Sequence, residues 1–179
     1  LTESTISWLT YDYEMDREHS IKEGSFDGQT IVQREFKAYI IENEYLKLTL
    51  VPDFGGRIVS MIYKPTGHEE LYQNPIGAPY LIGDQIFYHD WLMVWGGIFP
   101  TFPEPEHGKT WNLPWDIEII TDNGKMVEVE MSFTDEIHNP NAPWNYPTGR
   151  TGIICRFRVQ LEDGRAAFDT HVELENPAI

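Results

Sequence analysis

The sequence predicts an all-β protein, an antiparallel β-sandwich, and three observations support this class. Apolar and polar residues alternate with period two in several segments, which is typical of strands with one buried face. Dipeptides that favour tight hairpin turns stand between those segments. We find no amphipathic helix of useful length and no internal repeat. With 179 residues, 41% of them apolar, the chain is long enough to bury a core between two packed sheets.

The expected strands follow one another along most of the chain. They span residues 36–42, 45–51, 57–64, 70–73, 115–121, 126–133, 153–161 and 166–175. In the sixth of these, valine and other apolar residues alternate with glutamate and serine, so one face of the strand is apolar. Asn123-Gly124 and Asp163-Gly164 each join two such strands and supply the positive φ angles of tight turns. The segment 64–69, "KPTGHE", predicts a third turn.

Three segments interrupt the pattern. Residues 1–35 are polar and mixed, so we expect a lead-in segment before a sandwich domain at residues 36–179. Residues 74–114 and 138–149 read as long loops rich in proline, glycine and aromatic residues. Long connections without secondary structure are uncommon unless they are functional or disordered, and the aromatic content of 74–114 argues against disorder. We therefore expect 74–114 to be a functional loop over a sheet.

Composition excludes some partners. The formal net charge of −16 would repel a phosphate backbone, so no nucleic-acid partner is expected. No run approaches the roughly 18 apolar residues of a membrane-spanning helix, so no membrane partner is expected either. Cys155 is the only cysteine, which rules out an internal disulfide. Its place in the alternating segment "GIICRFRVQL" predicts a small buried residue rather than a reactive thiol.

The loop contains the residues that point to a ligand. Four of the six tryptophans fall within it or just beyond it: Trp91, Trp95, Trp111 and Trp115. Core burial is the ordinary role of any one tryptophan. A cluster in a loop instead favours a sugar site, because aromatic rings stack on the C–H faces of sugars while polar side chains bind their hydroxyls. The available polar side chains are His89, Asp90, Glu104, Glu106, His107, Lys109 and Asn112.

Two further features bear on this candidate site. His107 stands between Glu106 and Gly108, so its imidazole is either a proton donor or a surface loop residue. His89 and Asp90 could join His107 and Glu106 around a metal, but the spacing matches no specific signature, so no metal and no cofactor are expected.

The sequence "PDFGGRI" (52–58) carries a glycine pair that permits close backbone approach, followed by Arg57. Arg57 would contact either a ligand oxygen or an internal carboxylate. The pair Gly96-Gly97 beside Trp95 again suits close approach by another segment or a ligand.

The residues 42–75, 95–119 and 168–176 resemble, in that order, segments of the galactose mutarotase-like (aldose 1-epimerase-like) superfamily. The similarity is greatest to an uncharacterised bacterial branch and covers about residues 36–176. It implies a large two-sheet supersandwich whose concave sheet holds a sugar, of which this chain would be the amino-terminal part. Mutarotases of the superfamily use a glutamate base at the anomeric hydroxyl and a histidine acid at the ring oxygen.

The resemblance maps His107 onto the early histidine of a His-Gly pair that contacts the sugar. It does not assign Arg57, because epimerases have a small residue there, and it places the main acid and base beyond residue 179. We therefore expect a domain that binds a mono- or oligosaccharide through Arg57, Trp95, Glu104, Glu106, His107, Trp111 and Trp115. Three functions remain open: part of a sugar 1-epimerase or related enzyme, a non-catalytic carbohydrate-binding domain of a larger protein, or a structural β domain.

Overall fold

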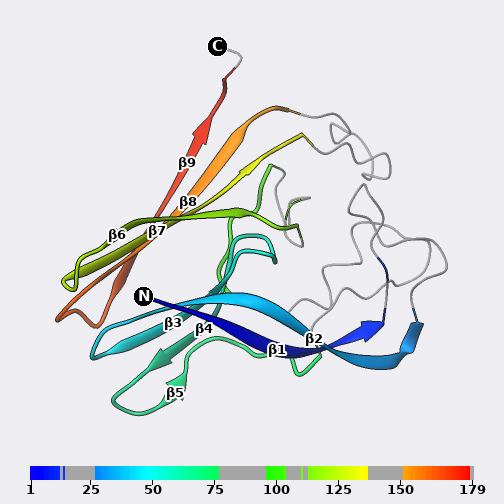
Figure 1. The fold of residues 1–179 in the computed structure, drawn as a ribbon, viewed down its shortest axis with the longest axis horizontal. Coiled ribbons are helices and arrows are strands. Elements are labelled where there is room, and N and C mark those ends of the chain that lie inside the picture. The colour runs from blue at the N-terminus through cyan, green and yellow to red at the C-terminus, as the bar shows by residue number, and fades with distance from the viewer. Residues whose placement is uncertain are drawn as a thin grey trace.

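A computed structural model describes residues 1–12, 14, 27–76, 96–103, 110, 113–136 and 151–177, which form two antiparallel sheets (Figure 1). The first sheet contains, in spatial order, β1 (Thr2–Asp12), β2 (Asp27–Glu42), β3 (Leu46–Val51), β4 (Arg57–Tyr63) and β5 (His68–Glu69). The second contains β6 (Asp116–Asp122), β7 (Met126–Thr134), β8 (Ile154–Glu162) and β9 (Phe168–Glu175). No helix occurs among the described residues, and the predicted all-β antiparallel sandwich is confirmed.

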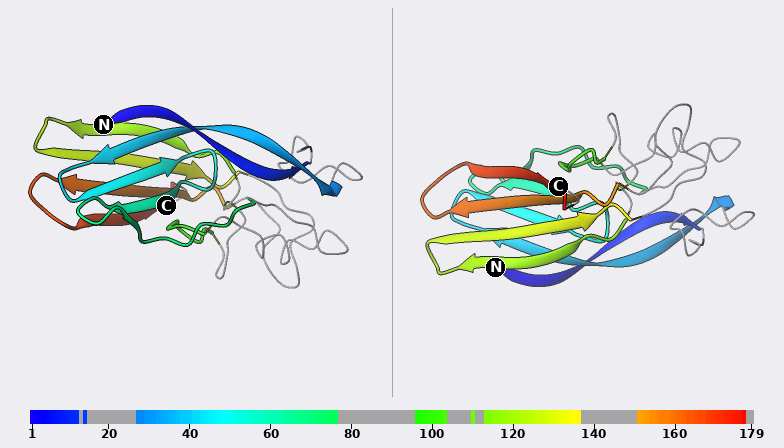
Figure 2. Two further views of the ribbon diagram at one scale, coloured as in Figure 1. Left: turned by 90° about the horizontal axis from the view of Figure 1, so that it is seen from below. Right: turned by 90° about the horizontal axis from the view of Figure 1, so that it is seen from above.

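The strands of the two sheets run in broadly similar directions and face each other across one core (Figure 2). The inward side chains of β3, such as Leu48, meet those of β7 and β8, such as Val129 and Val159. These three side chains are fully buried, which is what the period-two pattern of each strand predicts. Cys155 belongs to the same core, as predicted.

A second apolar cluster lies on the opposite, outer face of the first sheet. Val59 follows the core residue Ile58 in β4 and so points away from the core. The buried members of this outer cluster are Ala38, Val51, Phe54 and Val59, and Ile6, Trp8, Phe36 and Phe99 pack against them. The first sheet therefore has apolar contacts on both of its faces.

Two predictions about strand positions were wrong. Residues 1–35 are no lead-in segment, because they contain β1 and the first half of β2, and β1 pairs with β2 in the first sheet from Thr2 opposite Ile40 to Tyr11 opposite Ile31. The strand expected at 70–73 is the two-residue β5 instead. Its end is set by Glu69, whose carboxylate accepts hydrogen bonds from the backbone N–H groups of Met61 and Leu71, so the chain leaves the sheet there.

The remaining expected strands are present to within two residues at each end, except that β2 begins well before residue 36. The two hairpin glycines Gly124 and Gly164 have positive φ angles of 77° and 75°, as their turns require. At the end of the second sheet, β9 places Val172 and Leu174 on the inner face, where they remain half exposed or more. No helix of the described chain is long and apolar enough to cross a membrane.

Candidate functional site

The turn between β3 and β4 anchors the chain on both sides of the predicted site. At one end, Ile98 forms a two-hydrogen-bond bridge with Ile58, at N···O distances of 2.9 and 3.0 Å. At the other end, the Gly55 N–H donates to the Leu113 carbonyl at 2.8 Å, and the Trp115 N–H donates to the Pro52 carbonyl at 3.0 Å. The segment 98–115 therefore begins and ends on the same short stretch of chain.

The two glycine pairs allow this close approach. Gly97 has a φ of 92°, and a Cβ atom there would lie 2.4 Å from the Ile58 carbonyl oxygen. A Cβ at Gly56, whose φ is 60°, would lie 2.8 Å from the Trp115 ring. Any larger residue at either position would meet both an unfavourable backbone conformation and a steric clash. The prediction that both pairs permit close backbone contact is confirmed.

Arg57 lies at the centre of this arrangement and is fully buried. Its Nε donates to the Phe54 carbonyl at 3.2 Å and its Nη1 to the Gly96 carbonyl at 2.6 Å. The guanidinium also lies 3.8 Å from the centre of the Phe99 ring, a cation–π geometry. Burial lowers the pKa of Arg57 to about 9, so the group is still charged at neutral pH. Arg57 thus joins the β3–β4 turn to residues 96–99, from a buried rather than a surface position.

Trp115 is a core residue in the structure. Its side chain is 4% exposed, and its ring lies against Gly56 and beside Phe133, with 5.8 Å between the ring centres. The indole N–H donates to the Thr110 carbonyl at 3.3 Å, and the Thr110 hydroxyl donates to the Phe102 carbonyl at 2.9 Å. Trp115 therefore packs in the core. Its hydrogen bond to Thr110 also holds the chain just ahead of it.

The other predicted site residues lie outside the described part of the chain: Trp95, Glu104, Glu106, His107 and Trp111. The same holds for the further candidates Trp91, His89, Asp90, Lys109 and Asn112. Their roles stay predictions. The structure brings Arg57 and Trp115 to opposite sides of the β3–β4 turn, with Arg57 next to the outer cluster and Trp115 in the core.

Sequence reasoning missed one member of this arrangement, Phe99. It stands in a proline-rich stretch with no periodicity, so only its place two residues after Gly97 hinted at contact with the β3–β4 turn. Within the described residues, no group of three or more histidine, cysteine, aspartate or glutamate side chains is placed to hold a metal ion.

The fold is an antiparallel β-sandwich. The long connection between its two sheets is hydrogen-bonded at both ends to residues at the β3–β4 turn. The chain belongs to the family described as Domain of unknown function (DUF5107), which matches residues 23–141. A solved structure, that of a TPR-domain containing protein from Parabacteroides distasonis ATCC 8503, is similar with a TM-score of 0.70 at 18% identity. The match covers 98% of this chain and 29% of that one, and it shows a shared fold. No curated protein matches the chain.

Proposed function

We propose that this protein is a carbohydrate-binding domain of mutarotase-like fold, and that segment 95–115 forms its binding site. The observation that carries the proposal is that the structure fixes both ends of this segment on the β3–β4 turn, through Ile98 and Trp115. Between the fixed ends, the sequence provides Glu104, Glu106, His107 and Trp111, which are residue types that bind sugar hydroxyls and stack on sugar rings.

The anchors favour binding for a physical reason. A loop loses conformational entropy when a ligand orders it. This loss costs about 0.5–1.5 kcal/mol of binding free energy for each immobilised side chain. Fixed ends and a buried cation at Arg57 reduce the number of conformations that the segment can adopt before a ligand arrives. Arg57 and Trp115 then act as supports beneath the site, and residues 95–111 make the contacts.

The first possibility is a sugar 1-epimerase or a related enzyme. His107 is the candidate proton donor in this chain. The alternative is a non-catalytic carbohydrate-binding domain, and the burial of Trp115 favours a third possibility in which the segment mainly packs against other parts of the protein. Polarimetry with α-glucose or α-galactose distinguishes the first two, because only an epimerase accelerates the equilibration of anomers.

The binding test is a titration of the folded chain with a panel of monosaccharides, followed by tryptophan fluorescence. We expect a saturable change with at least one sugar, and a loss of affinity of about tenfold or more for His107→Ala and for Trp111→Ala. His68→Ala is the matched control, because His68 lies in β5, outside the segment, and its largely exposed imidazole contacts Glu70. Absence of any response in a chain shown to be folded by circular dichroism would overturn the proposal. Altered oligomeric state or stability without altered sugar affinity would support the structural alternative.

A further inference from the structure

A cavity of about 490 Å³ opens on the outer face of the first sheet, away from the core. Its floor is formed by β3 and β4, one wall by β1, and another wall by the chain that follows β5. The described lining residues are Ile6, Ser7, Trp8, Leu9, Thr49, Val59, Ser60, Gln73, Asn74 and Pro75. We refer to it below as the β1–β4 groove. Its volume lies within the range of about 300–1,000 Å³ that is typical of small-molecule sites.

The described lining of the groove carries no charged side chain. A phosphate or carboxylate ligand would need a cationic partner, and a metal ion would need carboxylate, imidazole or thiolate ligands. The described lining offers neither of these. It offers instead the hydroxyls of Thr49 and Ser60, two amides and one indole. This set fits a ligand that is neutral and polar.

Thr49 presents a hydroxyl to the groove. Its side chain is 7% exposed, and no hydrogen bond joins its hydroxyl to another described residue. A hydroxyl group can donate one hydrogen bond and accept two. Among the described residues, that of Thr49 is not one of the fully buried polar atoms that lack a partner, so the hydroxyl is accessible from the groove. A ligand hydroxyl in the groove would satisfy both its donor and its acceptor capacity.

Two further polar groups are held in place at the groove. The Gln73 amide nitrogen donates to the Val59 carbonyl at 2.7 Å, which leaves the amide oxygen as an acceptor to which none of the described residues donates. The Ser60 hydroxyl donates to the Glu69 carboxylate at 2.5 Å, so its oxygen can accept a hydrogen bond from a ligand. Both acceptors face a site that already contains the Thr49 hydroxyl.

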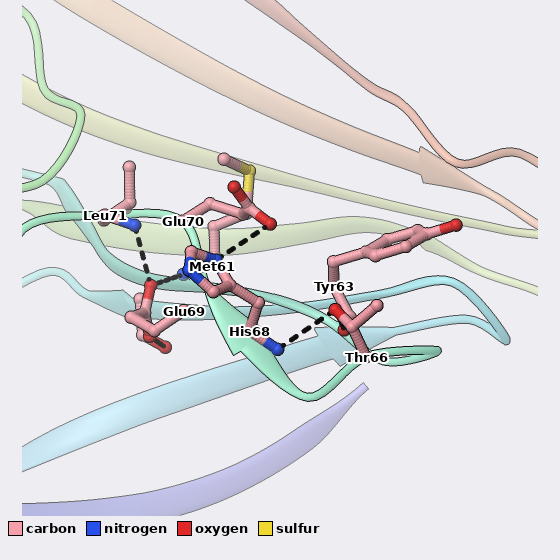
Figure 3. A network of polar contacts seen from close by, with 8 residues as sticks. Met61, Tyr63, Thr66, His68, Glu69, Glu70 and Leu71 are labelled. Carbon is pink, nitrogen blue, oxygen red and sulfur yellow. Dashed lines mark hydrogen bonds and ion pairs between the residues drawn. The ribbon is translucent and has the colours of Figure 1, made fainter.

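Glu69 also fixes the wall of the groove. One of its carboxylate oxygens accepts from the backbone N–H groups of Met61 at 2.8 Å and Leu71 at 3.0 Å, as Figure 3 shows. Those bonds tie the chain after β5 back onto β4, just ahead of Gln73 and Asn74. The groove is therefore built by interactions that do not themselves need a ligand.

Trp8 supplies the aromatic surface. Its indole N–H donates to the Asn74 carbonyl at 3.0 Å, which spans the groove from β1 to the opposite wall and fixes the plane of the ring. Its side chain packs partly against the outer cluster. An immobilised indole beside several hydroxyl and amide groups is the combination that recognises the C–H face and the hydroxyl edge of a sugar ring.

We propose that the β1–β4 groove binds a neutral polyhydroxylated ring of monosaccharide size. The proposal goes beyond the function proposed above, because it uses described residues of the first sheet and none of the residues 95–115. Thr49 would exchange hydrogen bonds with one ligand hydroxyl, Gln73 and Ser60 would accept from others, and Trp8 would lie along the ring.

The test is isothermal titration of the full chain with D-glucose, D-galactose, D-mannose and D-xylose, together with sodium phosphate as an anionic probe. We expect at least one sugar to bind and phosphate not to bind at this groove. Thr49→Val, which removes the hydroxyl and keeps the shape, should weaken that sugar about tenfold, or 1.4 kcal/mol. Thr170→Val on the exposed part of β9 is the matched control and should leave the affinity unchanged.

Gln73→Ala provides a second variant at an exposed position, so the test does not depend on the buried substitution alone. Sugar affinity unchanged in both Thr49→Val and Gln73→Ala would overturn the groove site. If affinity is then lost only in His107→Ala and Trp111→Ala, the site in segment 95–115 stands and the groove does not. If it is lost only in the groove variants, the groove stands and the segment does not. No binding of any of the four sugars would contradict the groove proposal.

Discussion

The outer faces of the two sheets differ in how they are made. The first sheet carries a second apolar cluster on its outer face, with Phe54 almost completely buried there, and also the β1–β4 groove. The second sheet carries a row of ion pairs on its outer face. Arg156 reaches Glu175 at 2.7 Å and Glu130 at 3.6 Å, and Arg158 reaches Glu130 at 2.7 Å and Glu173 at 3.6 Å.

The difference indicates which face is available for binding. Paired charges on β7, β8 and β9 satisfy one another and suit contact with water, where such pairs contribute little to stability. The outer face of the first sheet instead combines packed aromatic residues, a buried cation and the Thr49 hydroxyl in the lining of the β1–β4 groove. We therefore propose that ligands bind to the first sheet and its connections.

The largest expected effect comes from removing an outer-face aromatic of the first sheet. Phe54→Ala removes a ring that packs edge-on against Phe36, with 5.6 Å between the ring centres. We expect a loss of about 3–5 kcal/mol in the free energy of unfolding, measured by urea denaturation, because the substitution leaves a cavity. Tyr72→Ala, at an exposed aromatic, should cost about 0.5 kcal/mol or less. Equal costs for the two would show that the outer cluster is not a second core.

The second-largest expected effect tests the contact between β4 and the start of segment 95–115. Gly97→Ala forces a Cβ atom to within 2.4 Å of the Ile58 carbonyl at a φ of 92°, so we expect a loss of about 2 kcal/mol or more in stability. Gly124→Ala is matched in backbone conformation, but its Cβ would meet no atom within 4 Å. It should cost only the strain of a left-handed alanine, about 1 kcal/mol. A Gly97→Ala variant as stable as Gly124→Ala would contradict the close contact.

A smaller effect is expected on the outer face of the second sheet. Arg156→Met removes contacts to Glu130, Glu173 and Glu175, all of which are partly or well exposed. We expect a loss of no more than about 1 kcal/mol in urea denaturation. The loss should shrink in concentrated salt, because screening weakens exposed pairs. A large, salt-independent loss would mean that this face is covered in the protein and would weaken the contrast between the two sheets.

The smallest effect concerns Cys155, which neighbours Arg156 on β8 but points into the core. Burial raises the pKa of its thiol to about 11, so almost no thiolate is present in the folded protein at pH 8. We expect negligible reaction with Ellman's reagent at pH 8 and stoichiometric reaction after denaturation. Reactivity should rise as the pH approaches 11, since the thiolate form then becomes populated. Rapid labelling of the native protein at pH 8 would contradict the orientation of β8.

The sequence was informative where alternation is strong and one face is buried. β7 and β8 alternate apolar and charged residues along their whole length, so both were predicted closely. β1 was missed because only its Ile6 and Trp8 side chains form an apolar stripe, and the rest of this edge strand is largely polar or exposed. β5 was misplaced because its end depends on hydrogen bonds from Glu69 to the backbone, which no periodicity reveals.

The candidate site was less predictable for a related reason. The glycine pairs predicted that another segment lies close to the backbone at these positions. The structure confirms this at Gly56 and Gly97. The partners of Arg57 did not follow from the sequence, because two of its contacts are backbone carbonyls, one of them 39 residues away. The β1–β4 groove was also not foreseen, since it joins Trp8, Thr49 and Gln73, which lie far apart in the chain.

The most direct test of the account is an NMR titration of the isotopically labelled chain with monosaccharides, read at each backbone amide. We predict saturable shifts at the first sheet and its anchored connection, at residues such as Thr49, Gln73 and Phe99. The outer face of the second sheet, around Arg156 and Glu173, should stay unchanged. Shifts confined to that second-sheet face, or none with any sugar, would contradict the assignment of binding to the first sheet.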